Sequence, residues 1–451
     1  MEANRGQWSS KIGFIFAAAG SAIGLGNIWR FPYVAGENGG AAFVLLYLFF
    51  VVIIGLPYMF AEFALGRHSK RNPIGAIEKI KPGSAWKLVG GLGIVTGLVI
   101  LSFYGVIAGW TFGYIFNIAF GNTMVFGDFI SHPLIVLLLF AFFMLITTFI
   151  VYGGVESGIE KWSKILMPIL LVLLFGLVIY ANTLEGSSEG LSFYLKPDFS
   201  KINGSVILSA LGQAFFSLSL GMGLMVTYGS YLPKSADIMS STFYIGLFDT
   251  MIAIMSGLII FPALFSMGGN VSQGPELIFM VFPKLFAQIP GGFAIGTIFF
   301  VLLSIAALTS TISLLEVPVS YIVDEKKKDR KKIVWKVAFV AFLIGLPSAL
   351  SQGSVDIFTD FGVVPLYFAD PDFLSQVSFL FGDVSLTVGA FFLSIFVGWV
   401  WGARHAAEEI SEGSRSFSKI KGLWIFMMKY FIPIVLFLFI LNLFGLYDLI
   451  F

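Results

Sequence analysis

Residues 20–33 read GSAIGLGNIWRFPY and interrupt the first long apolar segment of the chain. Glycines, an asparagine, an arginine and a proline stand where a membrane-spanning helix would be uniformly apolar. The backbone groups that a broken helix exposes at membrane depth need partners other than lipid. In membrane proteins such breaks line sites for ions and polar solutes. The stretch therefore predicts a buried polar binding site.

The composition is typical of a membrane protein. Of the 451 residues, 57% are hydrophobic and 12% are charged, and the mean hydropathy is +0.92. A soluble chain of this size could not bury so much apolar surface. The net charge of +1 argues against a nucleic-acid partner, and the lack of cysteine excludes disulfides and thiolate metal sites. No obligate protein partner is indicated.

We expect an all-α polytopic membrane protein, because a helix needs about 20 apolar residues to cross a bilayer. The eleven expected spans cover residues 12–36, 41–66, 88–120, 133–152, 164–182, 205–232, 238–267, 285–322, 333–350, 377–403 and 425–447. Lys and Arg gather before the first span and after the second, fourth, sixth, eighth and tenth. This asymmetry predicts a multi-pass protein of the cell membrane with a cytoplasmic amino terminus and an extracellular carboxyl terminus.

Four ionisable residues fall within or at the ends of these spans, namely Arg30, Glu62, Asp249 and Glu316. Each would be costly against lipid and should face protein or water. For any one of them, a purely structural interhelical hydrogen bond is about as good an explanation as a functional role. For Glu316, near Pro318 at a span end, we favour that explanation. For Asp249, which has apolar neighbours, we expect a cation partner.

A second interruption lies in the sixth span, where residues 215–223 read FFSLSLGMG. Glycine also serves close helix packing, but two interrupted helices five spans apart are the pattern of an inverted five-helix repeat. We expect repeats over residues 1–182 and 205–403, with helices 1 and 6 broken, followed by an extra helix at 425–447. Hydroxyls at 309–311 in the eighth span either bond to their own helix or add to the site.

The two breaks offer backbone carbonyls and hydroxyls, together with the amide of Asn27 and the carboxylate of Asp249. Such hard oxygen ligands suit alkali and alkaline-earth cations, and a single carboxylate favours a monovalent ion. The residues alone therefore indicate an ion-coupled transporter of a polar substrate. We expect no enzymatic activity, since the histidines, His68, His132 and His405, lie in expected loops. A channel or a sensor on the same fold remains an alternative.

The motif at 20–33 and the residues Glu62, Trp110-Thr111, Ser217–Gly223 and Leu308–Ser310 resemble those of the neurotransmitter:sodium symporter family. The likeness covers nearly the whole chain, and eleven spans are typical of a bacterial subgroup that transports hydrophobic amino acids. The resemblance implies two sodium sites. The first would be formed by Ala22, Asn27, Ser217 and Asp249. The second would be formed by carbonyls of Gly20, Ile23 and Ala306 and hydroxyls of Thr309 and Ser310.

The resemblance also implies how the charges balance and what is carried. Asp249 stands where relatives commonly have asparagine, and its carboxylate could replace the chloride that animal members bind. Gly24 stands where transporters of monoamines have aspartate, so we expect an amino acid. The residues implied to surround it are Ser21, Ala22, Gly24, Leu25, Gly26, Ile100, Tyr104, Phe216, Ser217, Ser219, Met222, Ser310, Ser313 and Leu314.

Because no charged side chain is in that set, we expect a hydrophobic substrate side chain. With the carboxylate of Asp249 in place of chloride, we expect chloride-independent, sodium-coupled import of hydrophobic L-amino acids across the bilayer. The adaptable Met222 favours a broad range that includes aromatic side chains. The alternative is another zwitterion such as a betaine-like osmolyte, although an aromatic cage would have only Tyr104 and Phe216.

The resemblance further implies two gates and a hinge. The outer gate would be Arg30 and Gln213, and an ungapped alignment places the tenth-span partner of Arg30 at Ser378, with Asp372 and Asp383 nearby. The inner gate would be Arg5, Trp8, Tyr231 and Asp324. Gly158 and Pro168 would form a hinge in the fifth span, where proline removes a helix hydrogen bond.

Overall fold

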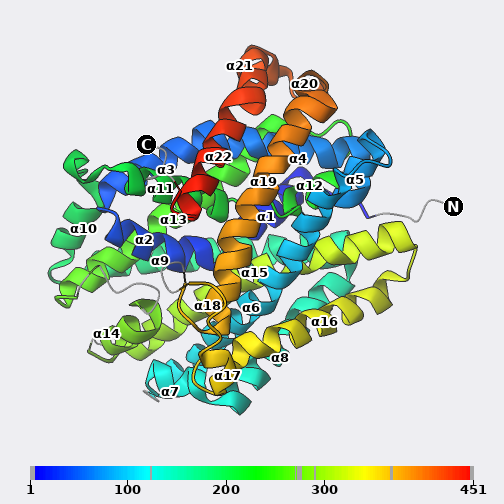
Figure 1. The fold of residues 1–451 in the computed structure, drawn as a ribbon. Coiled ribbons are helices and arrows are strands. Elements are labelled where there is room, and N and C mark those ends of the chain that lie inside the picture. The colour runs from blue at the N-terminus through cyan, green and yellow to red at the C-terminus, as the bar shows by residue number, and fades with distance from the viewer. Residues whose placement is uncertain are drawn as a thin grey trace.

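The computed structural model describes residues 6–121, 124–269, 271, 277–288, 291–365 and 369–446. These residues form a bundle of crossing helices without strands (Figure 1). Nine of the described helices are long and apolar enough to cross a membrane, and a bent pair makes a tenth. The remaining expected span, 205–232, consists of two helices that are each too short to cross alone. The prediction of an all-α, multi-span protein with two broken helices is confirmed.

The first five spans are span one with α1 (Lys11–Ala22), η1 (Gly26–Arg30) and α2 (Phe31–Glu37), span two with α3 (Ala41–Phe50), η2 (Val51–Gly55) and α4 (Leu56–Ser69), span three with α6 (Lys87–Ala119), span four with α8 (Pro133–Tyr152), and span five with η3 (Val155–Glu160) and α9 (Lys161–Ala181). The next four are span six with α11 (Gly204–Ser217) and α12 (Leu224–Ser230), span seven with α13 (Ile238–Ser266), span eight with α15 (Gly292–Lys326), and span nine with α16 (Arg330–Leu350). The last two are span ten with α18 (Phe373–Val377), η7 (Ser378–Ser385), α19 (Leu386–Ile395), η8 (Phe396–Gly402) and α20 (Ala403–Ser411), and span eleven with α21 (Lys421–Phe426), η10 (Met427–Phe431) and α22 (Ile432–Leu443). Shorter helices between the spans are α5 (Pro73–Ile80), α7 (Phe126–Ser131), α10 (Ser187–Leu195), η4 (Phe199–Lys201), η6 (Leu277–Val281), α14 (Phe282–Gln288), α17 (Asp356–Thr359) and η9 (Arg415–Lys419).

The expected boundaries of three spans are wrong. Span five begins at Val155 rather than at 164, because the carboxylate of Glu160 is buried and hydrogen-bonded inside the helix. Span eight begins at Gly292 rather than at 285, because Gly291 has a φ of 72° and separates α14 from α15. Span ten continues on both sides of the expected 377–403. The boundaries of the two repeats stay a prediction.

Polar residues determine where several helices begin. The side chains of Asn203, Asp237 and Asp329 accept backbone N–H groups at the starts of α11, α13 and α16. These bonds satisfy donors that the first turn of a helix leaves without a partner.

Spans two and six pack backbone against backbone. A Cβ atom on Gly66 would lie 2.0 Å from the carbonyl oxygen of Val226, and one on Gly229 would lie 2.7 Å from that of Phe63. Small residues permit such close packing of membrane helices. The contact places α4 directly against the second break, and the carboxylate of Glu62 accepts the N–H of Gly221 at 3.1 Å.

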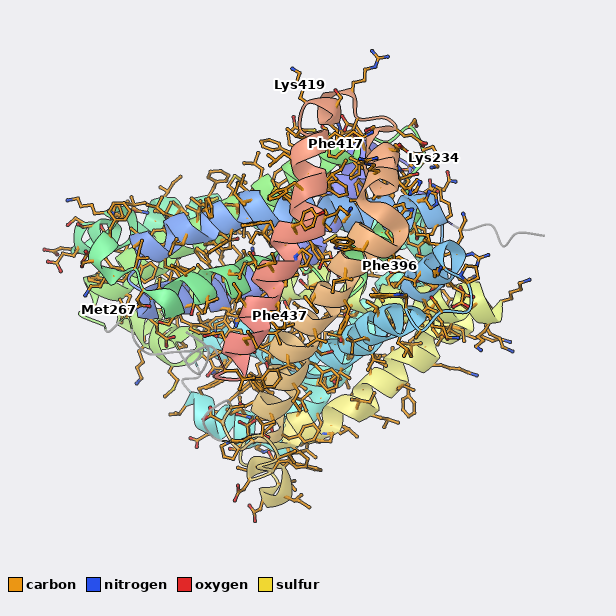
Figure 2. All side chains as sticks on the ribbon, turned by 45° about the horizontal axis from the view of Figure 1, so that its top comes forward. Lys234, Met267, Phe396, Phe417, Lys419 and Phe437 are labelled. Carbon is orange, nitrogen blue, oxygen red and sulfur yellow. The ribbon has the colours of Figure 1, made fainter. Side chains whose placement is uncertain are left out.

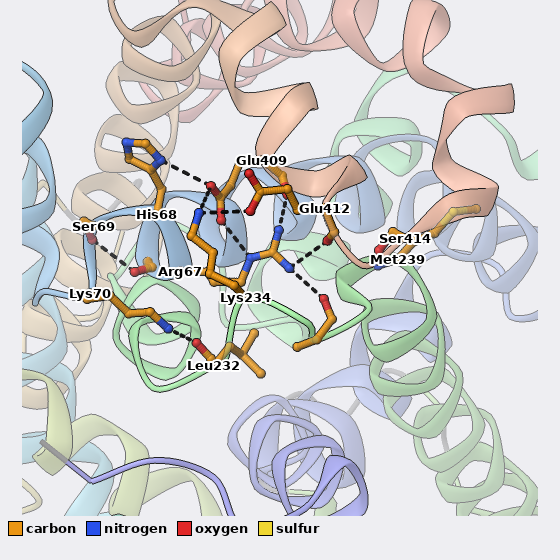
Figure 3. A network of polar contacts seen from close by, with 12 residues as sticks. Arg67, His68, Ser69, Lys70, Leu232, Lys234, Met239, Glu409, Glu412 and Ser414 are labelled. Carbon is orange, nitrogen blue, oxygen red and sulfur yellow. Dashed lines mark hydrogen bonds and ion pairs between the residues drawn. The ribbon is translucent and has the colours of Figure 1, made fainter.

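A buried arginine joins three segments at the end of the molecule that carries α20 (Figure 3). The guanidinium of Arg67 donates to the carboxylate of Glu409 at 2.8 Å and to the carbonyl of Ala236 at 2.6 Å. It also donates to the carbonyls of Glu409 and Glu412. The end of span two, the loop between spans six and seven, and the end of span ten are therefore held together.

Lys234 extends this network to the protein surface. Its ammonium lies 2.6 Å from a carboxylate oxygen of Glu409 and 3.1 Å from one of Glu412. His68 contacts the same oxygen of Glu409 at 3.2 Å. Partial burial lowers the pKa of Lys234, but the hydrogen bonds and charges of the two glutamates raise it overall.

Candidate functional site

The first break lies at residues 23–25. Ile23 leaves the helical conformation with a ψ of 115°, and the helices before and after the break meet at an angle of 53°. The freed N–H of Gly24 donates to the side-chain oxygen of Asn27 at 3.1 Å. The carbonyl of Ile23 turns toward Thr309 and Ser310 of span eight, at 3.4 and 3.2 Å from their hydroxyls.

The second break lies between Ser217 and Leu224, and three of its residues have positive φ. These are Ser219 with 52°, Gly221 with 84° and Gly223 with 75°. The hydroxyl of Ser219 donates to the carbonyl of Ser21 at 3.1 Å, so the two breaks contact each other. Polar backbone groups of two spans thus meet inside the bundle, as the sequence predicts.

The structure brings together the side chains expected at the first sodium site. The amide of Asn27 donates to Ser217 Oγ at 2.8 Å and to Asp249 Oδ1 at 2.7 Å, and Ser217 donates to Asp249 Oδ2 at 2.8 Å. All three are buried, as is Ala22 at the end of α1. Within the described residues, the side chains that donate to the Asp249 carboxylate are neutral. A buried carboxylate with neutral partners suits a monovalent cation, which would balance its charge.

Tyr47 also belongs to this cluster, although sequence reasoning did not include it. Its hydroxyl lies 3.0 Å from Ser217 Oγ and donates to Asp249 Oδ2 at 3.2 Å. In a run of aliphatic residues a tyrosine counts as apolar, so hydropathy alone gave no signal for it.

The residues expected at the second sodium site also converge. Thr309 Oγ1 lies 2.9 Å from the carbonyl of Ala306 and faces that of Ile23. A Cβ on Gly20 would lie 3.2 Å from Thr309, so α1 and α15 touch at this point. With Ser310, these atoms form an uncharged group of hydroxyl and carbonyl oxygens.

The central residues expected around the substrate are in direct contact. A Cβ on Gly24 would lie 2.5 Å from both Tyr104 Oη and Ser310 Oγ. The N–H of Leu25 donates to Tyr104 Oη at 2.8 Å, and a Cβ on Gly26 would lie 2.8 Å from the ring of Phe216. Glycine is therefore required at both positions for this close approach.

The remaining expected lining residues are buried around the breaks. Ser21 donates to Ser313 at 2.7 Å. Ile100, Met222 and Leu314 are buried. None of these side chains carries a charge.

Among the residues expected at the outer gate, Arg30 pairs with Asp383. Their side chains lie 3.2 Å apart, and the Arg30 guanidinium stands 4.5 Å above the ring centre of Phe216. Gln213 donates to the carbonyl of Gly26 at 2.9 Å. The expected alignment position, Ser378, is not the partner, because residues 378–385 are π-helical and do not keep the α-helical spacing.

Asp372 is not the partner either. Its carboxylate instead accepts the N–H of Ser375 at the start of α18 and the side-chain amide of Gln352.

Of the residues expected at the inner gate, Trp8 and Tyr231 contact each other. Trp8 is buried and donates to the carbonyl of Tyr228 at 3.0 Å, and its ring meets that of Tyr231 edge-on. The Asp324 carboxylate accepts the backbone N–H of Asn72 at 3.3 Å and its side-chain amide at 3.4 Å. Arg5, the fourth expected member, lies outside the described residues.

Sequence reasoning missed the role of Arg330 beside this gate. Tyr231 donates to Glu316 at 2.7 Å, and Arg330 donates to the same carboxylate at 2.9 and 2.6 Å. Glu316 thus has the interhelical bond that we favoured for it, with an arginine as a further partner. The sequence feature that could have indicated this ion pair is a glutamate in span eight followed by an arginine at the start of span nine.

The expected hinge residues lie in span five. Gly158 belongs to the π-helical turn η3, and a Cβ there would lie 2.1 Å from the carbonyl of Ile150. Pro168 lies inside α9. The carboxylate of Glu160 next to the hinge accepts Ser9 N at 2.7 Å.

Comparison with known proteins gives a consistent family. The model of the sodium:neurotransmitter symporter family matches residues 5–126 and 125–449. The uncharacterized sodium-dependent transporter YhdH of Bacillus subtilis is 40% identical over 450 residues, with 97% of this chain and 98% of the relative covered. The human sodium- and chloride-dependent GABA transporter 2 is 26% identical, with 94% of this chain and 78% of the relative covered.

A solved structure shares the fold. The crystal structure of MhsT in complex with L-phenylalanine matches with a TM-score of 0.88 and 42% identity, covering 98% of this chain and 100% of that one. The broken helices, the cluster around Asp249 and these matches agree: the chain belongs to the sodium:neurotransmitter symporter family.

Proposed function

We propose that this chain imports hydrophobic L-amino acids, aliphatic and aromatic, together with two sodium ions and without chloride. The observation that carries the proposal is the buried contact of Asn27, Ser217 and Asp249 beside the glycines of the first break. Family membership supports sodium coupling.

The two ions would bind to different kinds of site. The first would lie at the Asp249 cluster, where the fixed negative charge offsets that of sodium and makes chloride unnecessary. Ala22 would add its carbonyl. The second would lie among Gly20, Ile23, Ala306, Thr309 and Ser310, whose oxygens are neutral.

The substrate would lie against the first break. Gly24 and Gly26 leave space for a carboxylate beside Tyr104 Oη and the first sodium ion. The uncharged wall of Ile100, Met222 and Leu314 suits a hydrophobic side chain. The complex of MhsT with L-phenylalanine supports an amino acid of this class.

Transport would proceed by alternating access, in which spans one, two, six and seven move against the others. Sodium and substrate bind the same assembled site, so each raises the affinity for the other. Arg30 with Asp383 would close the outer side, and Trp8 with Tyr231 the inner side. Gly158 and Pro168 would let span five unwind toward the second ion. The amino terminus would be cytoplasmic and the carboxyl terminus extracellular, in the cell membrane.

Uptake into proteoliposomes tests the proposal. We expect an inward sodium gradient to concentrate labelled leucine or phenylalanine, and replacement of chloride by gluconate to leave the rate unchanged. Hydrophobic amino acids should compete, and betaine should not. Competition by betaine alone would contradict the proposed substrate class. A steep chloride dependence at constant sodium would contradict the proposal that Asp249 makes chloride unnecessary. Flux that never exceeds equilibrium would indicate a channel.

A further inference from the structure

Lys429 is a charged residue inside the eleventh span. It lies in η10, about 12 Å along the helix axis from Lys421 at a rise of about 1.5 Å per residue. Its ammonium lies over two aromatic rings, 4.5 Å from the ring centre of Trp399 and 5.8 Å from that of Tyr430. None of the ion pairs found among the described residues includes it. A lysine in a membrane span without a carboxylate partner calls for a functional explanation.

The backbone around Lys429 is arranged to hold the indole of Trp399 in place. The π-helical stretches η8 and η10 lie against each other, and a Cβ on Gly398 would lie 2.7 Å from the carbonyl oxygen of Met428. Trp399 Nε1 donates to the carbonyl of Lys429 at 2.9 Å. This bond fixes the ring under the ammonium. π-Helical turns of this kind are frequent at functional sites.

The group faces outward from the protein. Trp399 is 54% exposed, Phe426 55% and Tyr430 44%. Spans ten and eleven run side by side here, and the loop that carries Lys419 lies at the same end of the molecule (Figure 2). Exposed Trp and Tyr in membrane proteins mark the level of the lipid headgroups. A lysine can extend its ammonium from a span to that level.

We propose that Trp399, Lys429 and Tyr430 bind the phosphate of an anionic phospholipid in the leaflet next to the basic loops. The two rings contact the ammonium through their faces, and its N–H groups remain to donate to phosphate oxygens. A lipid with net negative charge complements this ammonium, which forms no ion pair with the described residues, and the exposed Arg404 on α20 adds a second positive charge at this end. A zwitterionic lipid carries its own positive group beside the phosphate, so it should bind this site more weakly than an anionic lipid does.

Lipid retention tests this site. The full chain is reconstituted into phosphatidylcholine nanodiscs with or without phosphatidylglycerol, retained lipids are counted by native mass spectrometry, and the unfolding temperature is measured. Phosphatidylglycerol should be retained by the wild type and should raise its unfolding temperature. Lys429→Met should retain about fivefold less, the change expected for one basic contact with the headgroup layer. Lys429→Arg should behave as the wild type.

Two further variants separate this site from general surface charge. Trp399→Leu removes the ring and keeps the lysine, and should also reduce retention; it decides the question if Lys429→Met does not fold. Lys419→Met removes an exposed lysine at the same end and should have no effect. Equal retention by Lys429→Met and wild type, or equal loss in Lys419→Met, would overturn the proposal. So would a stabilisation by inorganic phosphate alone in phosphatidylcholine discs.

Discussion

The side-chain amide of Asn27 lies 2.7 Å from a carboxylate oxygen of Asp249, although the two residues are 222 positions apart in the chain. The bond joins the first break to span seven. Because Ser217 of the second break donates to the same carboxylate, three spans meet at one negative charge. Burying a carboxylate among neutral donors is costly, and a bound cation would remove that cost.

The first prediction concerns this charge. Asp249→Asn should lower sodium affinity by about tenfold to hundredfold, as expected for the loss of a charged ligand. Added chloride should restore part of it. The measurement is the sodium dependence of leucine uptake in proteoliposomes. Asp360→Asn, at an exposed carboxylate, is the control and should behave as the wild type. An unchanged sodium dependence in Asp249→Asn would contradict the assignment.

The second prediction concerns the space beside Tyr104. Gly24→Ala would place a methyl group 2.5 Å from Tyr104 Oη and Ser310 Oγ. Such overpacking costs about 1–3 kcal/mol, so amino acid affinity should fall about fivefold or more. Scintillation proximity binding of labelled leucine measures this. Gly176→Ala, where a Cβ meets nothing within 4 Å, is the matched control. Equal affinity in both variants would show that the substrate does not bind here.

The third prediction distinguishes the acidic partners of Arg30. Asp383→Asn should slow uptake, and Arg30→Gln should add little to it in the double variant. A coupling of about 0.5–3 kcal/mol is expected for residues in contact. Asp372→Asn should weaken the start of α18 without coupling to Arg30. Coupling of Arg30 with Asp372 instead would contradict the structure.

The breaks could be predicted from sequence because they violate a strong physical rule. Glycine, Asn27 and Arg30 have no place in a lipid-facing helix, so their presence pointed to the site directly. The second break was found in the same way, and the structure confirms that the two meet.

Two features had no such signal, the role of Tyr47 and the choice of Asp383 as the partner of Arg30. Tyr47 passes as apolar in a hydropathy pattern, and Asp383 could not be chosen because η7 departs from the α-helical repeat. The sequence prediction begins span five at 164, whereas the helix begins at Val155 and includes Glu160. A carboxylate that is hydrogen-bonded to Ser9 is compatible with burial, and this pairing depends on the tertiary fold.

The fourth prediction concerns the second ion. Thr309→Val keeps the shape of the side chain and removes the hydroxyl that faces Ile23. Loss of one neutral oxygen ligand should lower sodium affinity by about three- to tenfold, with little change at saturating sodium. Sodium titration of leucine binding measures it. Thr297→Val on the same helix, whose hydroxyl bonds to its own turn, is the control. If both variants titrate alike, Thr309 is not a ligand.

A fifth prediction concerns the buried Arg67 and the network around it. Arg67→Met removes the buried cationic partner of the Glu409 carboxylate, of which 3% is exposed, and should cost about 3–5 kcal/mol of stability. The double variant with Glu409→Met should recover part of this loss. Thermal unfolding in detergent measures both, and Arg415→Met at an exposed arginine is the control. A double variant less stable than Arg67→Met would contradict the pairing.

The same network fixes the sign of one pH effect. Because the pKa of Lys234 is raised in the folded state, its contribution is complete below its ordinary value of about 10.4 and is lost as pH rises through the raised pKa. The stability difference between the wild type and Lys234→Met should therefore be constant around neutral pH and shrink only in strongly alkaline solution. A difference that disappears near neutral pH would mean that Lys234 is not charged when it contacts Glu409 and Glu412.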